Sequence, residues 1–310
     1  MRLAKFAPLL LAFATAPLAA QDAPAPVAAA KAPAPKLIVV ISVDQFSADL
    51  FAQYRNRFTG GFKRLLDGAV FPSGYQSHAA TETCPGHSTI MTGDRPARTG
   101  IIANEWADLN GARPGMVYCA EDETLPGTTY ENYIASDTHL KVPTLGERMK
   151  IADPRVRTVS VAGKDRAAIM MGGHKVDALW FWRDGKGFIS YADRAVPTSV
   201  TRANALAKAQ IAKPGTAMAE PDWCKPIDRP VVARGRTVGN GKFERPAKAE
   251  PLWKASPAFD TAIFGLATSM VQDMKLGKGP TTDVLTIGAS ATDYVGHGFG
   301  TEGSDRKSVV

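Results

Sequence analysis

The chain has 310 residues, 45% of them hydrophobic, so it can bury one large core or two small ones, and a disordered protein is excluded. Its formal net charge of +7 falls to about +5 when Arg2 and Lys5 are removed with a predicted leader. The remaining lysines and arginines are scattered, which favours anionic ligands in general and argues against nucleic-acid binding.

Residues 1–20 have the pattern of a secretory signal peptide. Arg2 and Lys5 precede an apolar stretch over residues 6–18, and two alanines end the segment. A buried first helix is the alternative, but residues 21–35 are rich in Ala and Pro and predict a tether. No later stretch has the roughly 18 apolar residues of a transmembrane helix. We expect an exported protein, periplasmic or extracellular, with no transmembrane segment in the mature chain.

Two segments in the first third of the chain have clear patterns. Residues 36–44 (KLIVVISVD) form a β-branched run that is typical of a central parallel strand buried on both faces. Residues 81–93 (TETCPGHSTIMTG) predict a loop that turns into a helix, with Pro85 in an early position and Gly93 at the end. Thr83 is therefore expected where this helix begins.

The rest of the chain alternates between helix and strand patterns. In chain order, we expect short helices at 46–55 and 61–66, an extended segment at 69–75, a helix at 144–151, strands at 156–162, 179–183 and 187–191, an amphipathic helix at 259–274 and a buried strand at 283–290. Residues 192–251 are richer in Pro, Lys and Arg and are expected to form a cap or insertion. This order predicts an α/β fold, an open, mostly parallel sheet with helices on both faces.

Three cysteines, Cys84, Cys119 and Cys224, belong to a protein that is expected to reach an oxidising compartment. One pair could form a disulfide and one thiol would remain, but the spacing does not identify the pair. Cys84 is interpreted as a packing residue, because no residue at a suitable spacing could act as its base.

Polar residues follow two of the predicted parallel strands, where ligands gather in such sheets. Asp44 ends the first strand; Asp293 and His297 follow the last one, spaced so that both could bind one ion on a helical turn. At the start of its helix, Thr83 would lie near free backbone N–H groups, beginning with that of Cys84, which could bind an anion. Taken alone, Asp44 would more often be a helix cap than a ligand, and helix capping explains the location of Thr83 equally well. The other histidines are expected to be satisfied or solvent-facing: His78, His87, His139 and His174.

Five short blocks of sequence, taken together in chain order, resemble the alkaline phosphatase superfamily. They are SVDQ (42–45), TETCPGHSTIMTG (81–93), GIIANEW (100–106), GKDR (163–166) and SATDYVGH (290–297). More narrowly, the chain resembles the threonine-nucleophile alkaline phosphatases, relatives of nucleotide pyrophosphatase/phosphodiesterases, over residues 37–303. Any one block is a weak signal, but five in the right order are specific.

The resemblance implies a site with two Zn²⁺. Thr83 would be the nucleophile, would become phosphorylated, and would bind one Zn²⁺ together with Asp44. Asp293 and His297 would bind the other Zn²⁺. Two cations a few Å apart can stabilise both the attacking and the leaving oxygen of a phosphoryl transfer.

The resemblance also implies a substrate-binding set. Asn104 would donate a hydrogen bond to a phosphoryl oxygen, and Lys164 and Arg166 would contact the remaining oxygens and favour a monoester dianion. A planar guanidinium suits two phosphate oxygens, and an ammonium acts as a point charge. Without the resemblance, a solvated Lys-Asp-Arg turn would be the simpler interpretation.

The chain departs from the family pattern at its end. The family completes its metal sites with an Asp-His pair after a later strand and a His near the C-terminus, and neither precedes Val310. Residues 305–310 (DRKSVV) are what a sequencing-adapter string encodes. We therefore expect a partial catalytic domain over residues 36–304, a non-native tail, and a chain that is inactive by itself.

Three functions follow from the sequence. The leading hypothesis is an exported, zinc-dependent phosphomonoesterase that acts on small phosphate esters through a phosphothreonine intermediate. The second is a phosphodiesterase or nucleotide pyrophosphatase with the same metals, and Lys164 and Arg166 argue against it because a diester carries less charge. The third is a non-catalytic exported domain that binds anions.

Overall fold

The computed structural model describes residues 33–300 apart from residues 72, 73, 77, 112, 114, 220, 221, 228–230, 234 and 239–241. The chain divides into two compact units, Met1–Ala34 and Pro35–Val310. The predicted signal peptide, nearly all of the tether and the tail at 305–310 lie outside the described residues. Every element named below belongs to the Pro35–Val310 unit.

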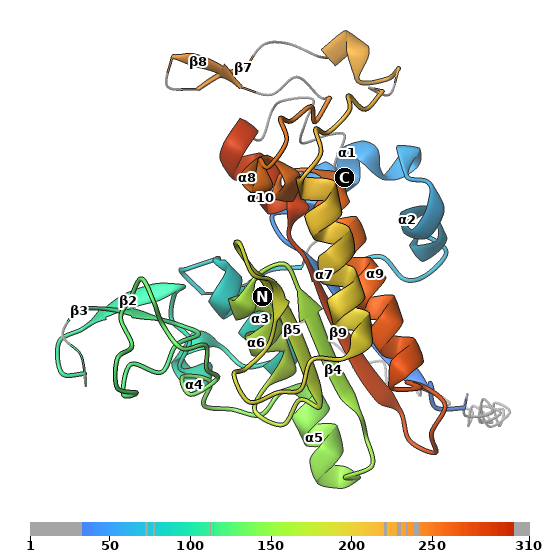
Figure 1. The fold of residues 1–310 in the computed structure, drawn as a ribbon. Coiled ribbons are helices and arrows are strands. Elements are labelled where there is room, and N and C mark those ends of the chain that lie inside the picture. The colour runs from blue at the N-terminus through green and yellow to red at the C-terminus, as the bar shows by residue number, and fades with distance from the viewer. Residues whose placement is uncertain are drawn as a thin grey trace, which may run out of the picture. The chain divides into compact units, whose positions relative to one another are not determined.

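The unit is built on a five-stranded sheet in the order β1-β9-β4-β5-β6 (Figure 1). Its strands are β1 (Leu37–Val43), β4 (Thr158–Ala162), β5 (Ala178–Arg183), β6 (Gly187–Ile189) and β9 (Asp283–Ala289). The β1–β9, β9–β4 and β4–β5 pairs are parallel, whereas β6 runs antiparallel to β5. The prediction of an open, mostly parallel sheet is confirmed.

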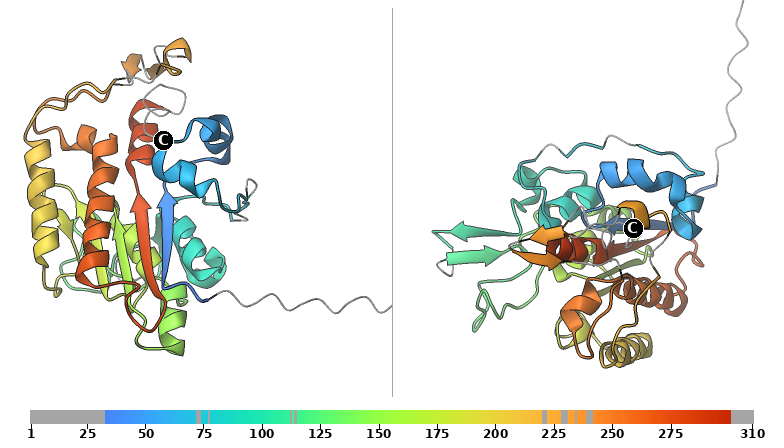
Figure 2. Two further views of the ribbon diagram at one scale, coloured as in Figure 1. Left: turned by 90° about the vertical axis from the view of Figure 1, so that its right-hand side faces the viewer. Right: turned by 90° about the horizontal axis from the view of Figure 1, so that it is seen from above.

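The helices cover both faces of this sheet (Figure 2). They are α1 (Ala48–Tyr54), α2 (Gly60–Leu65), α3 (Thr83–Thr92), α4 (Pro96–Thr99), α5 (Leu145–Ala152), α6 (Asp165–Gly172), α7 (Thr198–Ile211), α8 (Glu250–Lys254), α9 (Pro257–Asp273) and α10 (Ala291–Phe299). On one face α6 packs on β4 and β5, with α3 against α6; on the other, α9 packs on β9 and β4, with α7 against α9. None of the helices in the described part of the chain is long and apolar enough to cross a membrane.

The core has one hydrophobic cluster on each face of the sheet. Leu179 and Phe181 belong to the cluster with α3 and α6, whereas Trp180 and Trp182 belong to the cluster with α7 and α9. This division follows from the alternation of side chains along a strand. β4 and β9 are buried at every residue, as expected for central parallel strands.

β1 differs from its prediction because it lies at an edge of the described sheet. Its only partner there is β9, and the side chains of Val39 and Ile41 are 47% and 43% exposed. The prediction that this strand is central and buried on both faces is therefore wrong. The predicted extended segment at 69–75 contains no strand among its described residues.

Smaller elements lie outside the main sheet. They are the hairpins β2 (Glu105–Asp108) with β3 (Gly115–Tyr118) and β7 (Val231–Ala233) with β8 (Arg236–Val238), and the short 3-10 helices Arg55–Arg57 and Lys225–Ile227. β7 and β8 lie in the range 192–251, which the sequence predicts to be a cap. The same range contains α7, which packs on α9 and β6 and so forms part of the helical layer on the sheet.

Candidate active site

The carboxyl ends of β1, β4 and β9 meet at one end of the sheet, beside a cleft of about 940 Å³. α10 follows β9 at this end (Figure 2). The lining of the cleft includes every predicted site residue: Asp44, Thr83, Asn104, Lys164, Arg166, Asp293 and His297. The position agrees with the rule that ligands bind beyond the carboxyl ends of parallel strands.

β1 and β4 are each followed by a charged residue that lines the cleft. Asp44 follows β1 directly, and Lys164 lies between β4 and α6. The backbone at Gly163, just before Lys164, passes so close to Phe259 and Ser290 that an added Cβ would lie 2.8 Å from each. Only a glycine fits at this position, and with it the chain leaves β4 so that Lys164 lines the cleft.

Lys164 pairs with two carboxylates that the sequence assigns to metal binding. Its Nζ lies 2.9 Å from Asp44 Oδ2 and 2.5 Å from Asp293 Oδ2, and all three side chains are at least 90% buried. Burial alone would raise the pKa of Asp293, but the Lys164 ammonium lowers it, and the net shift is downward. The sequence predicts that Lys164 contacts phosphate. In the structure it pairs with the two carboxylates instead, because buried carboxylates need a positive partner.

The same geometry tests whether the residues present could hold divalent cations. Two carboxylates that converge on one ammonium define a place where positive charge is stabilised, and oxygen and imidazole donors suit zinc. α10 is helical at Asp293, as predicted, and His297 Nε2 lies 3.4 Å from Asp293 Oδ1. Among the described residues, however, no three His, Cys, Asp or Glu side chains converge on one metal position. Of the predicted pairs, Asp293 and His297 lie close enough together to contribute to one metal site, which the described residues do not complete.

Thr83 is the first residue of α3, as the sequence predicts, and the helix ends at Gly93 in the left-handed conformation (φ +73). The backbone N–H of Cys84 donates to Asn104 Oδ1 at 2.8 Å, so the prediction that it is free for an anion is wrong. The backbone N–H of Asn104 in turn donates to Glu82 Oε2 at 2.6 Å. These bonds fix Asn104 beside the start of α3 and leave its Nδ2 group as a donor.

A disulfide joins Cys84 to Cys119, and Cys224 is a buried thiol. The interpretation of Cys84 as a packing residue is corrected: it is buried, but it also crosslinks α3 to the residue that follows β3. The Cys119 backbone N–H donates to the carbonyl oxygen of Asn104 at 2.9 Å. The disulfide therefore lies next to both the predicted nucleophile and the predicted phosphate ligand Asn104.

His87 belongs to the site, although the sequence analysis treats it as a satisfied or solvent-facing histidine. It is buried; its Nδ1 donates to the carbonyl oxygen of Thr83 at 2.7 Å, and its Nε2 lies 3.3 Å from Asp44 Oδ1. Burial lowers the pKa of His87, against the opposing effect of Asp44. The signal that could have revealed it is its position four residues after Thr83, on the same side of α3.

Each of the other three histidines has at least one partner, although Nε2 of His78 is buried without one among the described residues. His78 bonds to the carbonyl oxygen of Ala80, His139 pairs with Glu123, and His174 bonds to Glu147 and the carbonyl oxygen of Leu140. None of them lines the cleft formed by the described residues.

Arg166 is held by Tyr118, a residue outside the predicted site. Its Nη1 donates to the hydroxyl of Tyr118 at 3.2 Å, and that hydroxyl donates to Asp165 Oδ1 at 2.7 Å. Tyr133 donates to the other carboxylate oxygen of Asp165. Tyr118 lies 48 residues from Arg166, and no spacing rule connects them.

Comparison with known proteins assigns the family. The model of the type I phosphodiesterase / nucleotide pyrophosphatase family matches residues 38–310. The chain belongs to this family. Its curated relatives include alkaline phosphatase PhoK of Sphingomonas sp, 55% identical over 87% of this chain and 49% of the relative. PhoD of Zymomonas mobilis is 46% identical (89% and 48%), and PafA of Elizabethkingia meningoseptica is 30% identical (86% and 52%). This phosphodiesterase-family chain spans about half the length of the curated relatives it matches.

Solved structures agree with this assignment. Wild-type alkaline phosphatase PafA superimposes with a TM-score of 0.76 at 27% identity, covering 89% of this chain and 57% of PafA. A PafA variant in which a threonine is changed to serine, and an asparagine, a lysine and an arginine to alanine, gives a TM-score of 0.77 at 26% identity, with the same coverage. The fold of this phosphodiesterase-family chain is therefore alkaline-phosphatase-like, and its relatives are hydrolases of phosphoric esters.

Proposed function

We propose that this chain is part of an exported, zinc-dependent phosphomonoesterase whose nucleophile is Thr83. The observation that carries the proposal is one cleft that gathers Thr83, Asn104, Lys164 and Arg166 from three separate segments. The PafA variant is altered at the same four residue types in the same order, which supports a shared set of functional residues. The names of the relatives support a phosphomonoester substrate.

In the proposed reaction the hydroxyl of Thr83 loses its proton and its oxygen bonds to phosphorus while the P–O bond to the leaving oxygen breaks, and that oxygen takes up a proton from water to leave as the alcohol. Water then hydrolyses the phosphothreonine and releases inorganic phosphate. Asn104 would donate its Nδ2 hydrogen bond to a phosphoryl oxygen, and Arg166 would neutralise the charge on the others. Two Zn²⁺, bound by Asp44 with Thr83 and by Asp293 with His297, would supply the positive charge that ionises the hydroxyl.

Export is supported by a second observation besides the leader pattern. The Cys84–Cys119 disulfide is typical of proteins that fold in an oxidising compartment, such as the periplasm or the extracellular space. Secretion of a reporter fused after residue 35 would test it. A reporter that stays in the cytosol would contradict the proposal.

The family description supports a second candidate, a phosphodiesterase or nucleotide pyrophosphatase. Arg166 and Lys164 discriminate between the two, because a monoester dianion gains more from cationic partners than a diester does. In a monoesterase, Lys164→Ala and Arg166→Ala should each lower the rate with a monoester more than the rate with a diester. An enzyme that prefers diesters before any substitution would favour the second candidate.

The central prediction concerns Thr83 and needs a protein of the relatives' length. We define the completed protein as residues 21–300 of this chain joined to the C-terminal half of the Sphingomonas relative. Thr83→Ala should lower its turnover of p-nitrophenyl phosphate by about a thousandfold or more, because no other group can form the covalent intermediate. Thr83→Ser keeps a hydroxyl and should retain measurable turnover, and Thr89→Ala, outside the cleft lining on the same helix, is the matched control.

Two further measurements separate the alternatives. Removal of metal with a chelator should abolish turnover, and added Zn²⁺ should restore it. The 310-residue chain should show no turnover with or without Zn²⁺. Unchanged turnover in the Thr83→Ala protein would refute the role of Thr83 as the nucleophile. Phosphate binding without any turnover in the completed protein would favour the hypothesis of a non-catalytic anion-binding domain.

A further inference from the structure

We infer that Tyr118 is a positioning residue for Arg166 and thereby helps to set the preference for monoesters over diesters. The inference rests on the proposed function, because it assumes that Arg166 binds the phosphoryl group. It concerns a residue outside the five sequence blocks and outside the lining of the cleft.

The Tyr118 hydroxyl connects Arg166 to a buried carboxylate. It accepts a hydrogen bond from Arg166 Nη1 at 3.2 Å and donates one to Asp165 Oδ1 at 2.7 Å. A phenol can do both at once, because it has one proton and two lone pairs. The carboxylate orients the hydroxyl proton, so the lone pairs of the oxygen remain available to the guanidinium.

This contact is the main constraint on the Arg166 side chain within the described part of the chain. Nε of Arg166 is buried there without a hydrogen-bond partner, and Asp165 bonds to the backbone N–H of Arg166 rather than to its guanidinium. The hydroxyl of Tyr118 therefore fixes one edge of the guanidinium. Because Arg166 lines the cleft, its remaining Nη N–H groups are the ones that could bind an anion there.

Tyr118 is itself rigidly held. It ends β3 and is 8% exposed, its backbone N–H donates to Glu121 Oε1 at 2.8 Å, and its ring packs on that of Tyr133 at 4.6 Å. The next residue, Cys119, is in the disulfide. Burial, reinforced by Asp165, raises the pKa of Tyr118 well above its ordinary value, so the hydroxyl keeps its proton at working pH.

Tyr133 provides a matched control. It also donates its hydroxyl to Asp165, but to the other carboxylate oxygen, and its ring lies against Arg183 at 4.5 Å rather than against Arg166. Tyr133→Phe and Tyr118→Phe each remove one oxygen and one hydrogen bond to the same carboxylate. They differ in whether Arg166 loses its partner.

The experiment measures kcat/KM for p-nitrophenyl phosphate and for bis-p-nitrophenyl phosphate in the completed protein. Tyr118→Phe should lower the monoester-to-diester ratio about tenfold, the size expected when a charged donor loses one hydrogen bond. Tyr133→Phe should change the ratio by less than about twofold. Inhibition by inorganic phosphate, also a dianion, should weaken in parallel with the ratio in Tyr118→Phe.

Two more proteins, Arg166→Ala and the double variant Arg166→Ala with Tyr118→Phe, show whether a negative result concerns the role of Arg166 or the role of Tyr118. If Arg166→Ala leaves the ratio unchanged, the proposed role of Arg166 is wrong. If Arg166→Ala lowers the ratio but Tyr118→Phe does not, the inference about Tyr118 is overturned and the proposed function stands. Equal losses in the two tyrosine variants, or a further loss when Tyr118→Phe is added to Arg166→Ala, would also overturn it. Phosphate inhibition of a Tyr118→Trp protein supplies the same comparison if Tyr118→Phe does not fold.

Discussion

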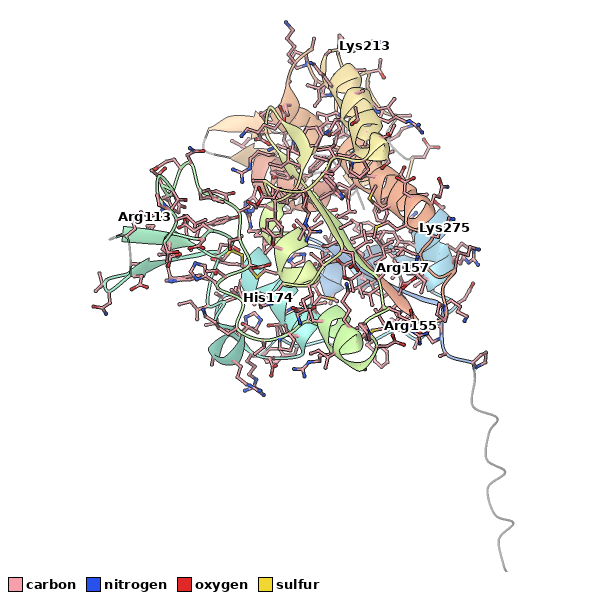
Figure 3. All side chains as sticks on the ribbon, turned by 60° about the horizontal axis from the view of Figure 1, so that its bottom comes forward. Arg113, Arg155, Arg157, His174, Lys213 and Lys275 are labelled. Atoms are coloured by element: carbon pink, nitrogen blue, oxygen red, sulfur yellow. A yellow bond between two sulfur atoms is a disulfide. The ribbon has the colours of Figure 1, made fainter. Side chains whose placement is uncertain are left out.

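At the scale of single residues, His174, labelled in Figure 3, connects the segment between α6 and β5 to Glu147 and Leu140. Its Nδ1 lies 3.1 Å from Glu147 Oε1 on α5, and its Nε2 lies 2.9 Å from the carbonyl oxygen of Leu140. Both neighbours accept hydrogen bonds, so the doubly protonated ring satisfies both. The bond to Glu147 raises the pKa of His174, and the same contact lowers the pKa of Glu147 despite its burial.

This pair predicts a pH-dependent stability. Because the pKa of His174 is raised in the folded state, its stabilising effect is complete below the ordinary value of 6.5 and is lost as pH rises through the raised value. His174→Gln should therefore lower the free energy of unfolding at pH 6 by about 1 kcal/mol or less, since the side chain is partly exposed, and by less at pH 9. Urea denaturation of the 310-residue chain and the variant at both pH values provides the measurement. A difference that does not depend on pH would contradict it.

That the predicted residues line one cleft could be predicted from sequence, but their contacts could not. The motif indicates a phosphate contact for Lys164, whereas its ammonium lies between two carboxylates, one of them 129 residues away. His87 lies inside one of the quoted blocks without a predicted role, and it is nevertheless buried beside Asp44. A motif carries side-chain chemistry, but the pairing of buried charges depends on distances between segments far apart in the chain.

At the scale of elements, α9 holds the start of α10, the helix that carries Asp293 and His297. Asp260 Oδ1 accepts hydrogen bonds from the backbone N–H groups of Ser290 at 2.8 Å and Ala291 at 3.0 Å. These groups have no partner within α10, so the carboxyl group caps the helix from outside. Burial raises the pKa of Asp260 from 3.8 to about 6, which means that its surroundings disfavour the charged form.

Two substitutions of Asp260 should have opposite consequences at pH 8. Because the folded pKa is raised, the ionised carboxyl costs stability above about pH 6, and this cost is absent below 3.8. Asp260→Asn keeps the accepting oxygen without the charge, so the free energy of unfolding should be unchanged or higher. Asp260→Ala leaves both N–H groups without an acceptor and should lower it by about 1–3 kcal/mol. Denaturation curves at pH 8 that rank alanine above asparagine would refute the capping role.

Elements with strong periodicity could be predicted, and elements without it could not. The strands at 156–162 and 283–290 and the helix at 259–274 correspond to β4, β9 and α9. α6 has no prediction, because seven of its eight residues are buried and so it has no polar face to reveal a helical period. Burial on all sides depends on tertiary packing, which a local pattern does not contain.

At the scale of the whole molecule, the sheet has an apolar edge at β1. The exposed Val39 and Ile41 lie on a strand whose outer side has no partner among the described residues. Unpaired apolar strands promote association. We expect the 310-residue chain to self-associate in solution.

A charged residue on this strand should reduce the association. Ile41→Lys places a charge on the edge strand at a side chain that is 43% exposed, so the monomer fraction should rise. Light scattering coupled to size-exclusion chromatography gives the mass. Leu109→Lys, at a 90% exposed leucine next to β2, is the control and should leave the mass unchanged. Equal effects of the two lysines would point to general solubility and not to β1.

The Cys84–Cys119 disulfide has a practical consequence for anyone who prepares this polypeptide. It closes a loop between positions 35 residues apart and lies against Asn104. Bacterial cytosol keeps thiols reduced, so a recombinant product made there would lack this crosslink. Protein purified from such a host would then differ from the native protein beside the cleft, and a secretory production route avoids that difference.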